Sequence, residues 1–169
     1  MRSRNELLGH VTARRRARRP LIGPAELSSW MSLVRLITRL PCAIDAPLQR
    51  EAELSMVEYM TLAMLAYAPE WTLRMSTLAE HTSTSLSRLS HLVMRLEGRG
   101  YVRREPDPMA GRFTNAILLP AGMSKLDSVA PGHVAYGRRL VVDNLSGERL
   151  RRPRQDAERI LGRIDSPAR

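Results

Sequence analysis

Apolar residues recur at helical spacing in two stretches near the start of the chain. From about Ala25 to Leu40 they fall three or four positions apart, which indicates a helix with one buried face. Pro41 should kink or restart this helix and Pro47 should end it, because proline lacks the amide hydrogen that a helix interior uses. From Met56 to Ala68 the face is almost wholly apolar, so the second stretch predicts a central helix.

A capping box marks the start of this central helix. The hydroxyl of Ser55 can accept a hydrogen bond from the amide of Glu58, and the carboxylate of Glu58 can reach back toward residue 55. The helix should therefore begin at Met56, and Pro69 should stop it.

The middle of the chain combines two helices with two strands. A short helix is expected over Ser76–His81, and the polar run Thr82–Ser85 after it is rich in residues that begin helices. A longer helix is expected over Leu86–Arg99. It carries four apolar side chains on one face: Leu89, Leu92, Val93 and Leu96. Tyr101–Glu105 and Ala116–Leu119 then predict the strands of a hairpin with a long tip.

Helical patterns return at the end of the chain, broken by prolines. A helix should open at Pro120, be interrupted at Pro131 and Gly132, and continue over His133–Asn144. Ser146 can cap a last helix with apolar and basic positions. Pro153 falls inside that helix and should kink or split it.

The order of short helix, polar turn, longer helix and hairpin is typical of a winged helix-turn-helix. In this fold the second helix of the pair packs one face on the core and offers the other to the major groove of DNA. Opposite the apolar face of Leu86–Arg99 lie Ser87, Arg88, His91, Met94 and Arg95. Arg88 is the best candidate for reading a guanine edge with two hydrogen bonds.

Charge strengthens this interpretation. The 169 residues carry a net charge of +10, with 26 arginines and the single lysine Lys125. Residues 1–24 hold seven arginines against one glutamate and show no apolar periodicity, so we expect a flexible basic arm. The arm could add phosphate or minor-groove contacts, be a solvated tail, or be a transit peptide. A chain of this charge should be attracted to nucleic acid.

Other classes of protein find little support. No apolar run approaches the roughly 20 residues of a membrane span, and the basic start is not followed by the apolar segment of a secretory signal. We expect no cofactor, no metal site and no enzyme activity, because the sequence shows no metal-ligand spacing, nucleophile elbow or phosphate-binding glycine loop. Cys42 cannot form an intramolecular disulfide, and we expect it to be dispensable, with redox sensing as the alternative.

Two further sets of residues have two interpretations each. We expect Met56, Met60, Met64 and Met75 to be core residues, although flexible thioethers can also border a lipophilic pocket. We expect His133 to cap a helix after the proline break, with lining of a ligand cavity as the alternative.

From Leu78 to Gly122 the sequence resembles the multiple-antibiotic-resistance regulator (MarR) family without gaps. The motifs are Leu78-Ala79-Glu80, Leu92-Val93, Arg95-Leu96-Glu97, Gly100-Tyr101-Val102, Asp107-Pro108, Arg112 and Pro120-Ala121-Gly122. Weaker similarity extends from Leu27 to about Ile164. The resemblance implies a mainly α-helical protein with a small β-hairpin wing, in which helices from both termini form a dimerisation region.

The resemblance also implies partners and site residues. It implies double-stranded DNA with a pseudo-palindromic operator, a homodimer, and a small lipophilic or phenolic effector bound between the dimer interface and the winged domain. Arg112 would enter the minor groove from the wing tip. The residues that would contact DNA are Ser85, Ser87, Arg88, Ser90, His91, Arg95 and Arg112.

Three features depart from the family pattern. Ala110 replaces an acidic residue that usually precedes the tip arginine, and Gly111 replaces a frequent second arginine, so we expect a more mobile tip. Pro153 should loosen the dimer interface. Leu86 and Met94 stand where polar residues are common, so base reading should depend on few side chains.

The sequence therefore predicts a ligand-responsive, homodimeric transcription regulator, acting as a repressor in the bacterial cytoplasm at the nucleoid. We divide it into the arm at 1–24 and a winged domain at 25–165, with dimerisation helices at 25–50 and 121–165 and a DNA-binding core at 54–119. The alternative is a basic architectural or adaptor protein that uses the same fold for non-specific DNA binding. The operator and the effector are not encoded in any motif.

Overall fold

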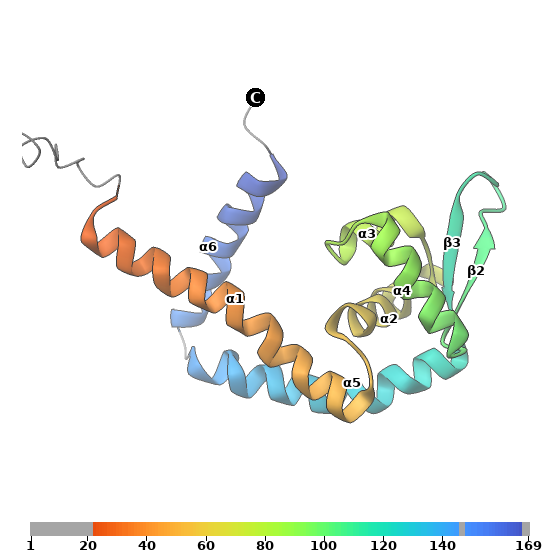
Figure 1. Cartoon of the computed structure of the whole chain (residues 1–169), viewed down its shortest axis with the longest axis horizontal. Coiled ribbons are helices and arrows are strands. Elements are labelled where there is room, and N and C mark those ends of the chain that lie inside the picture. Colours follow the sequence, from red (N-terminus) through yellow and green to blue (C-terminus); the bar gives the residue numbers. More distant parts are fainter. Residues whose placement is uncertain (1–21, 146–147, 167–169) are drawn as a thin grey trace, which may run out of the picture. The chain divides into compact units, whose positions relative to one another are not determined.

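The computed structural model describes residues 22–145 and 148–166 (Figure 1). Its helices are α1 (Pro24–Ala52), α2 (Met56–Tyr67), α3 (Met75–His81), α4 (Leu86–Gly98), α5 (Pro120–Leu140) and α6 (Glu148–Asp165). Its strands are β1 (Thr72–Arg74), β2 (Val102–Pro106) and β3 (Thr114–Leu118), and two short 3₁₀ turns cover Pro69–Trp71 and Val142–Asn144. The chain divides into two units between Arg39 and Leu40. The arm expected at the N-terminus, up to residue 21, and the capping role of Ser146 lie outside the described residues.

The predicted end of the first helix at Pro47 and the predicted interruption at Pro131 are wrong, and neither Pro41 nor Pro153 splits its helix. α1 runs on through Pro41 and Pro47, α5 runs through Pro131, and α6 runs through Pro153. Each proline removes one amide donor from the helix, while the bonds on either side remain. Buried side chains also anchor these helices to the core: Leu48 and Ala52 follow the prolines of α1, and Leu126 precedes the proline of α5. Tertiary packing therefore outweighs the local cost of a proline inside a helix.

The end of α5 also differs from the prediction. The helix stops at Leu140, four residues earlier than expected, and a 3₁₀ turn takes over. The side-chain amide of Asn144 donates to the carbonyl oxygens of Arg139 and Leu140 at 2.9 and 3.1 Å. Carbonyls at a helix end need such donors, so Asn144 completes the terminus of α5 from outside the helix.

The central position of α2 is confirmed. Leu62 and Leu65 are fully buried. The core also includes apolar side chains before and after α2: Leu54, Leu78, Leu89, Val93, Leu96, Val102 and Leu118. The core role of the methionines is confirmed as well. Met75 is buried, and Met56, Met60 and Met64 pack against the core cluster.

The capping box at the start of α2 is present. The amide of Glu58 donates to the hydroxyl of Ser55, and the carboxylate of Glu58 accepts from the amide of Ser55 at 2.8 Å. A side chain from the end of α1 adds to this turn, because Asp45 accepts from the amide of Met56 at 2.6 Å.

The predicted hairpin forms, and it gains a third strand. β3 lies between β1 and β2 and pairs antiparallel with both, so that Ala116 stands opposite Leu73 and Arg104. The hairpin of β2 and β3 is the wing of the fold (Figure 1). Because β1 comes directly before α3, its pairing with β3 ties the wing to the start of the helix-turn-helix.

Candidate nucleic-acid interface

The turn between α3 and α4 is built from the polar run of residues 82–85. Thr82 ends α3, and Ser83 adopts a left-handed conformation with φ of 49°. The amide of Thr84 donates back to the carbonyl of Ala79 at 3.0 Å, which closes the turn. Ser85 then caps α4, since its hydroxyl accepts from the amide of Arg88 at 3.3 Å.

The two faces of α4 are as the sequence predicts. Leu89, Leu92, Val93 and Leu96 are buried. The opposite face is exposed, and it carries Ser87, Arg88, His91, Met94 and Arg95, together with Leu86 at the first position. Ser90 is half-buried and borders a hollow of about 260 Å³ that side chains of the wing also line.

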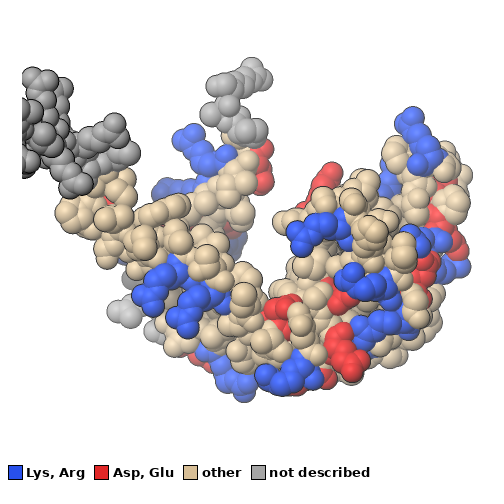
Figure 2. All heavy atoms as spheres, viewed as in Figure 1, with Lys and Arg blue, Asp and Glu red and all other residues tan. Residues whose placement is uncertain are grey.

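Ion pairs divide the seven arginines between residues 74 and 112 into two groups. Five are paired with carboxylates: Arg74 with Asp107, Arg95 with Glu58, Arg99 with Glu53, Arg103 with Glu105 and Arg104 with Glu97. Arg88 and Arg112 form no ion pair with a carboxylate of the described residues. Figure 2 shows the result, with basic and acidic side chains interspersed over this region. No described carboxylate compensates the charges of the other two guanidiniums, so these charges are available to a ligand.

Arg95 has a structural partner that the sequence does not reveal. Its guanidinium donates from Nε and one Nη to the carboxylate of Glu58 at 3.3 and 3.2 Å. Glu58 is buried and also accepts from Ser55, so it links the start of α2 to the middle of α4. A buried carboxylate needs such a cation, and this pairing gives Arg95 a role within the fold besides any at DNA.

The pair of Arg104 and Glu97 joins the wing to α4. Arg104 donates from its amide at 3.0 Å and from two guanidinium nitrogens at 2.8 and 2.6 Å. These hydrogen bonds lower the pKa of Glu97 below its usual value, because they favour the charged carboxylate. β2 is therefore fixed to the helix that carries Arg88.

Asp107 organises the tip of the wing. Its side chain is buried and accepts from the amides of Met109 and Ala110 and from Nε of Arg74. The amide of Met109 and then Arg74 hold the pKa of Asp107 below its usual value. Arg112 stands exposed on the same tip, with its Cζ atom 4.9 Å from the centroid of the Phe113 ring.

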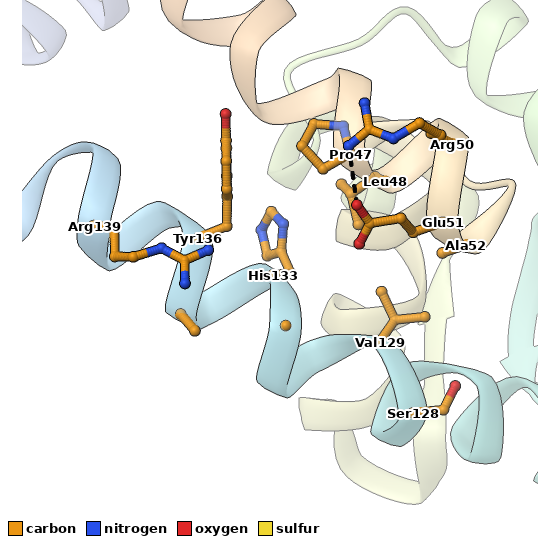
Figure 3. Close-up of a pocket in the computed structure, with 12 residues that line it drawn as sticks. Pro47, Leu48, Arg50, Glu51, Ala52, Ser128, Val129, His133, Tyr136 and Arg139 are labelled. Carbon is orange, nitrogen blue, oxygen red and sulfur yellow. Dashed lines mark hydrogen bonds and ion pairs between the residues drawn. The ribbon is translucent and has the colours of Figure 1, made fainter.

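A larger hollow of about 490 Å³ lies between the last turns of α1 and the middle of α5 (Figure 3). Pro47 and Leu48 contribute apolar surface from α1, and His133, Tyr136 and Arg139 line it from α5. The expected capping role of His133 is wrong, because α5 is continuous there and leaves no terminus to cap. The structure instead places His133 in the wall of this hollow.

The imidazole of His133 lies against a buried aromatic ring. Its centroid is 4.3 Å from that of Tyr59, at an interplanar angle of 47°. Burial lowers the pKa of His133 and raises the pKa of Tyr59, so both groups favour their neutral forms. The hollow is therefore lined by the neutral imidazole of His133, together with the hydroxyl of Tyr136 and the charge of Arg139.

Comparisons with known proteins agree with this geometry. A family model described as the MarR family matches residues 53–112. The chain is 37% identical to Sco3205, a MarR family transcriptional regulator from Streptomyces coelicolor whose crystal structure is in complex with DNA. The match covers 87% of this chain and 91% of that one, with a TM-score of 0.80. The chain belongs to the MarR family. A search of the curated proteins found no match.

Two further solved structures are similar to this MarR family member. It is 31% identical to AbsC, a MarR family transcriptional regulator from Streptomyces coelicolor, with a TM-score of 0.81 and coverage of 85% of this chain and 97% of that one. At 19% identity, the S. aureus MepR–DNA complex shares the fold, with a TM-score of 0.69, 79% of this chain and 96% of that one.

Family membership settles the broad function. As a MarR family transcriptional regulator, the protein is a DNA-binding regulator and not an enzyme. The predicted fold class, mainly α-helical with a winged helix-turn-helix, is confirmed. None of the described helices is long and apolar enough to cross a membrane. Among residues 22–145 and 148–166, no cluster of three or more potential metal ligands occurs.

Proposed function

We propose that this MarR family member is a homodimeric repressor that reads a pseudo-palindromic operator with α4 and the wing and responds to a small lipophilic or phenolic molecule. The observation that carries the proposal is the position of Arg88 and Arg112. One stands in the first turn of the reading helix and the other at the tip of the wing, and neither is neutralised by a described carboxylate. The DNA complex of Sco3205 supports the same use of the fold.

The exposed face of α4 enters the major groove in this proposal. Arg88 reads a base edge, and Ser87 and His91 lie beside it on the same face. Ser85 and Ser90 lie toward the start of the helix, where small hydroxyls and amides allow a close approach to phosphates. We assign Arg95 a phosphate contact at most, because its guanidinium is already engaged by Glu58.

Dimerisation is supported by apolar side chains that the single chain leaves exposed. In the first half of α1 these are Leu27, Trp30, Met31, Leu36 and Ile37. In α6 they are Ile160, Leu161 and Ile164. Contiguous apolar residues on an exposed helix mark an interaction surface, and a second copy of the chain supplies the matching surface by two-fold symmetry. Residues 25–50 and 121–165 are thus proposed as the dimerisation region.

The hollow between α1 and α5 is the proposed effector site. Its volume of about 490 Å³ suits a small aromatic molecule, and its walls combine apolar and polar groups. Leu48 belongs to the core and Tyr59 of the central helix lies against His133, so the hollow borders the winged core directly. A ligand there acts on DNA binding to the extent that it binds the DNA-free and DNA-bound conformations with different affinity.

The basic arm of residues 1–24 is proposed to add sequence-independent phosphate contacts. Seven arginines against one glutamate give it a charge of +6, more than half of the net charge of the chain. Contacts of this kind raise affinity for any duplex, and salt weakens them strongly. We place the protein at the nucleoid, in the bacterial cytoplasm.

A footprint on the region upstream of its own gene tests the proposal, followed by titrations of the protected duplex and a scrambled duplex at several salt concentrations. A regulator binds the protected duplex far more tightly than the scrambled one, with half-sites about one helical turn apart. Equal affinity for both would instead indicate the architectural alternative. Repeating the footprint with small aromatic acids and phenols tests the effector, and sedimentation tests the dimer.

A further inference from the structure

The tip of the wing is a closed loop that carries Arg112. The amide of Asp107 donates to the carbonyl of Phe113 at 2.9 Å, and the amide of Phe113 donates to the carbonyl of Ala110 at 2.9 Å. The carboxylate of Asp107 accepts from the amides of Met109 and Ala110 at 2.9 and 3.2 Å. The backbone on both sides of Arg112 is thus held by hydrogen bonds, although Gly111 precedes it.

Arg74 fixes this loop to β1. Its Nε atom donates to the second carboxylate oxygen of Asp107 at 2.7 Å, and its Cζ atom lies 4.9 Å from the centroid of the Phe113 ring. Arg74 therefore contacts both the first and the last residue of the loop. Asp107 compensates the charge of Arg74, so Arg74 should attract DNA phosphates only weakly.

Phe113 also contacts the tip arginine. The Cζ atom of Arg112 lies 4.9 Å from the centroid of the same ring, and Phe113 is the one phenylalanine of the chain. A carboxylate in place of the Phe113 ring would compensate the charge of Arg112 and occupy its hydrogen-bond donors. A ring face attracts the guanidinium and leaves its charge and its hydrogen-bond donors available.

We propose that Phe113 is the positioning residue of the wing: its ring, anchored by Arg74, holds the Arg112 guanidinium ready for the minor groove without neutralising it. The inference rests on the proposed function, in which Arg112 contacts DNA. It explains how the tip keeps an oriented cation although Ala110 offers no carboxylate. Arg74, although half exposed near the same ring, is an anchor and not a DNA contact.

The test measures affinity for a duplex that the wild-type protein selects from a random-sequence pool. Phe113→Leu keeps an apolar side chain but removes the ring, and it should weaken binding about two- to fivefold, which corresponds to an exposed cation–π contact. Phe113→Tyr keeps the ring and should bind like the wild type. In an Arg112→Ala background, Phe113→Leu should have no further effect, because the cation that the ring holds is gone.

Thermal unfolding of each variant separates positioning from folding. Loss of affinity in Phe113→Leu with an unchanged unfolding temperature, rescued by Phe113→Tyr, supports the inference. Unchanged affinity in Phe113→Leu, or an equal loss with and without Arg112, overturns it. If Arg112→Ala itself binds as tightly as the wild type, the wing contact of the proposed function fails instead, and if no duplex is selected, sequence-specific binding fails.

A double variant tests the role given to Arg74. Arg74→Gln with Asp107→Asn removes both charges of the pair and leaves the net charge unchanged. In an Arg112→Ala background the positioned cation is absent, and the slope of log affinity against log salt should lie about 1 below the wild-type value. Adding the double substitution to that background should leave the slope unchanged. A further reduction of about 1 would show that Arg74 contacts phosphate and would overturn its assignment as an anchor.

Discussion

Gly122 offers a direct test of the packing between α5 and the wing. It is the third residue of α5 and is buried. A Cβ atom added there would lie 2.2 Å from the carbonyl oxygen of Tyr101 and 2.7 Å from Cδ1 of Leu118. Non-bonded carbon and oxygen atoms do not approach so closely, so Gly122→Ala requires α5 and the segment before β2 to move apart.

The cost can be worked from what must move. The nearest neighbour is backbone, and the same carbonyl of Tyr101 accepts from the amide of Leu119 at 2.9 Å, so a shift also strains the hydrogen bond that precedes α5. Overpacking of this kind costs about 1–3 kcal/mol, and the upper end applies where no flexible side chain can give way. The higher helix propensity of alanine offsets about 1 kcal/mol. We expect Gly122→Ala to lower the free energy of unfolding by about 2 kcal/mol.

Gly137→Ala is the matched control in the same helix. A Cβ atom at Gly137 has no neighbour within 4 Å, so alanine should raise the free energy of unfolding by up to about 1 kcal/mol through helix propensity alone. Urea unfolding followed by far-ultraviolet circular dichroism, at one protein concentration, measures both. A wild-type midpoint for Gly122→Ala, or equal destabilisation by both variants, would refute the packing argument.

Three further predictions concern DNA binding and pH. Arg88→Ala should cost about 1–3 kcal/mol on the selected duplex and relax the preference at one base pair, whereas uniform weakening across a site library would assign Arg88 to phosphate. Burial lowers the pKa of His133, so the folded state binds its proton less readily than the unfolded state. The wild type should therefore lose stability as the pH falls below about 6.5, and urea titrations should show a smaller loss for His133→Gln; an equal loss would exclude His133 as the cause. Deletion of residues 1–24 should leave the unfolding midpoint unchanged and lower DNA affinity mainly at low salt, and a truncated chain that fails to fold would show that the arm is structural.

Local patterns in the sequence were sufficient for most of the fold. The spacing of Leu89, Leu92, Val93 and Leu96 predicts the buried face of α4, because a helix places residues three and four apart on one side. The capping box at Ser55 depends on four neighbouring residues, so it is legible without the tertiary structure. The wing hairpin is likewise a local motif. Since these signals also match a family with a known fold, the architecture followed from the sequence.

Contacts between distant elements were decided by the tertiary structure alone. The helices continue through Pro41, Pro47 and Pro131, because burial of neighbouring side chains outweighs the cost of a proline inside a helix. The sequence alone indicates only that cost and not the burial. β1 joins the wing because it pairs with β3, which lies 41 positions along the chain in the pairing of Arg74 with Asn115. No local pattern specifies such a partner.

The candidate site shows the same division. The sequence places Arg88, Arg95 and Arg112 together as cations of a DNA-binding surface, since exposure and charge type can be inferred from periodicity. It does not reveal that Glu58, 37 positions away, accepts from Arg95, or that Phe113 lies between Arg74 and Arg112 in the contact network. Whether a charge is compensated depends on which side chains meet across the fold, and folding alone determines that.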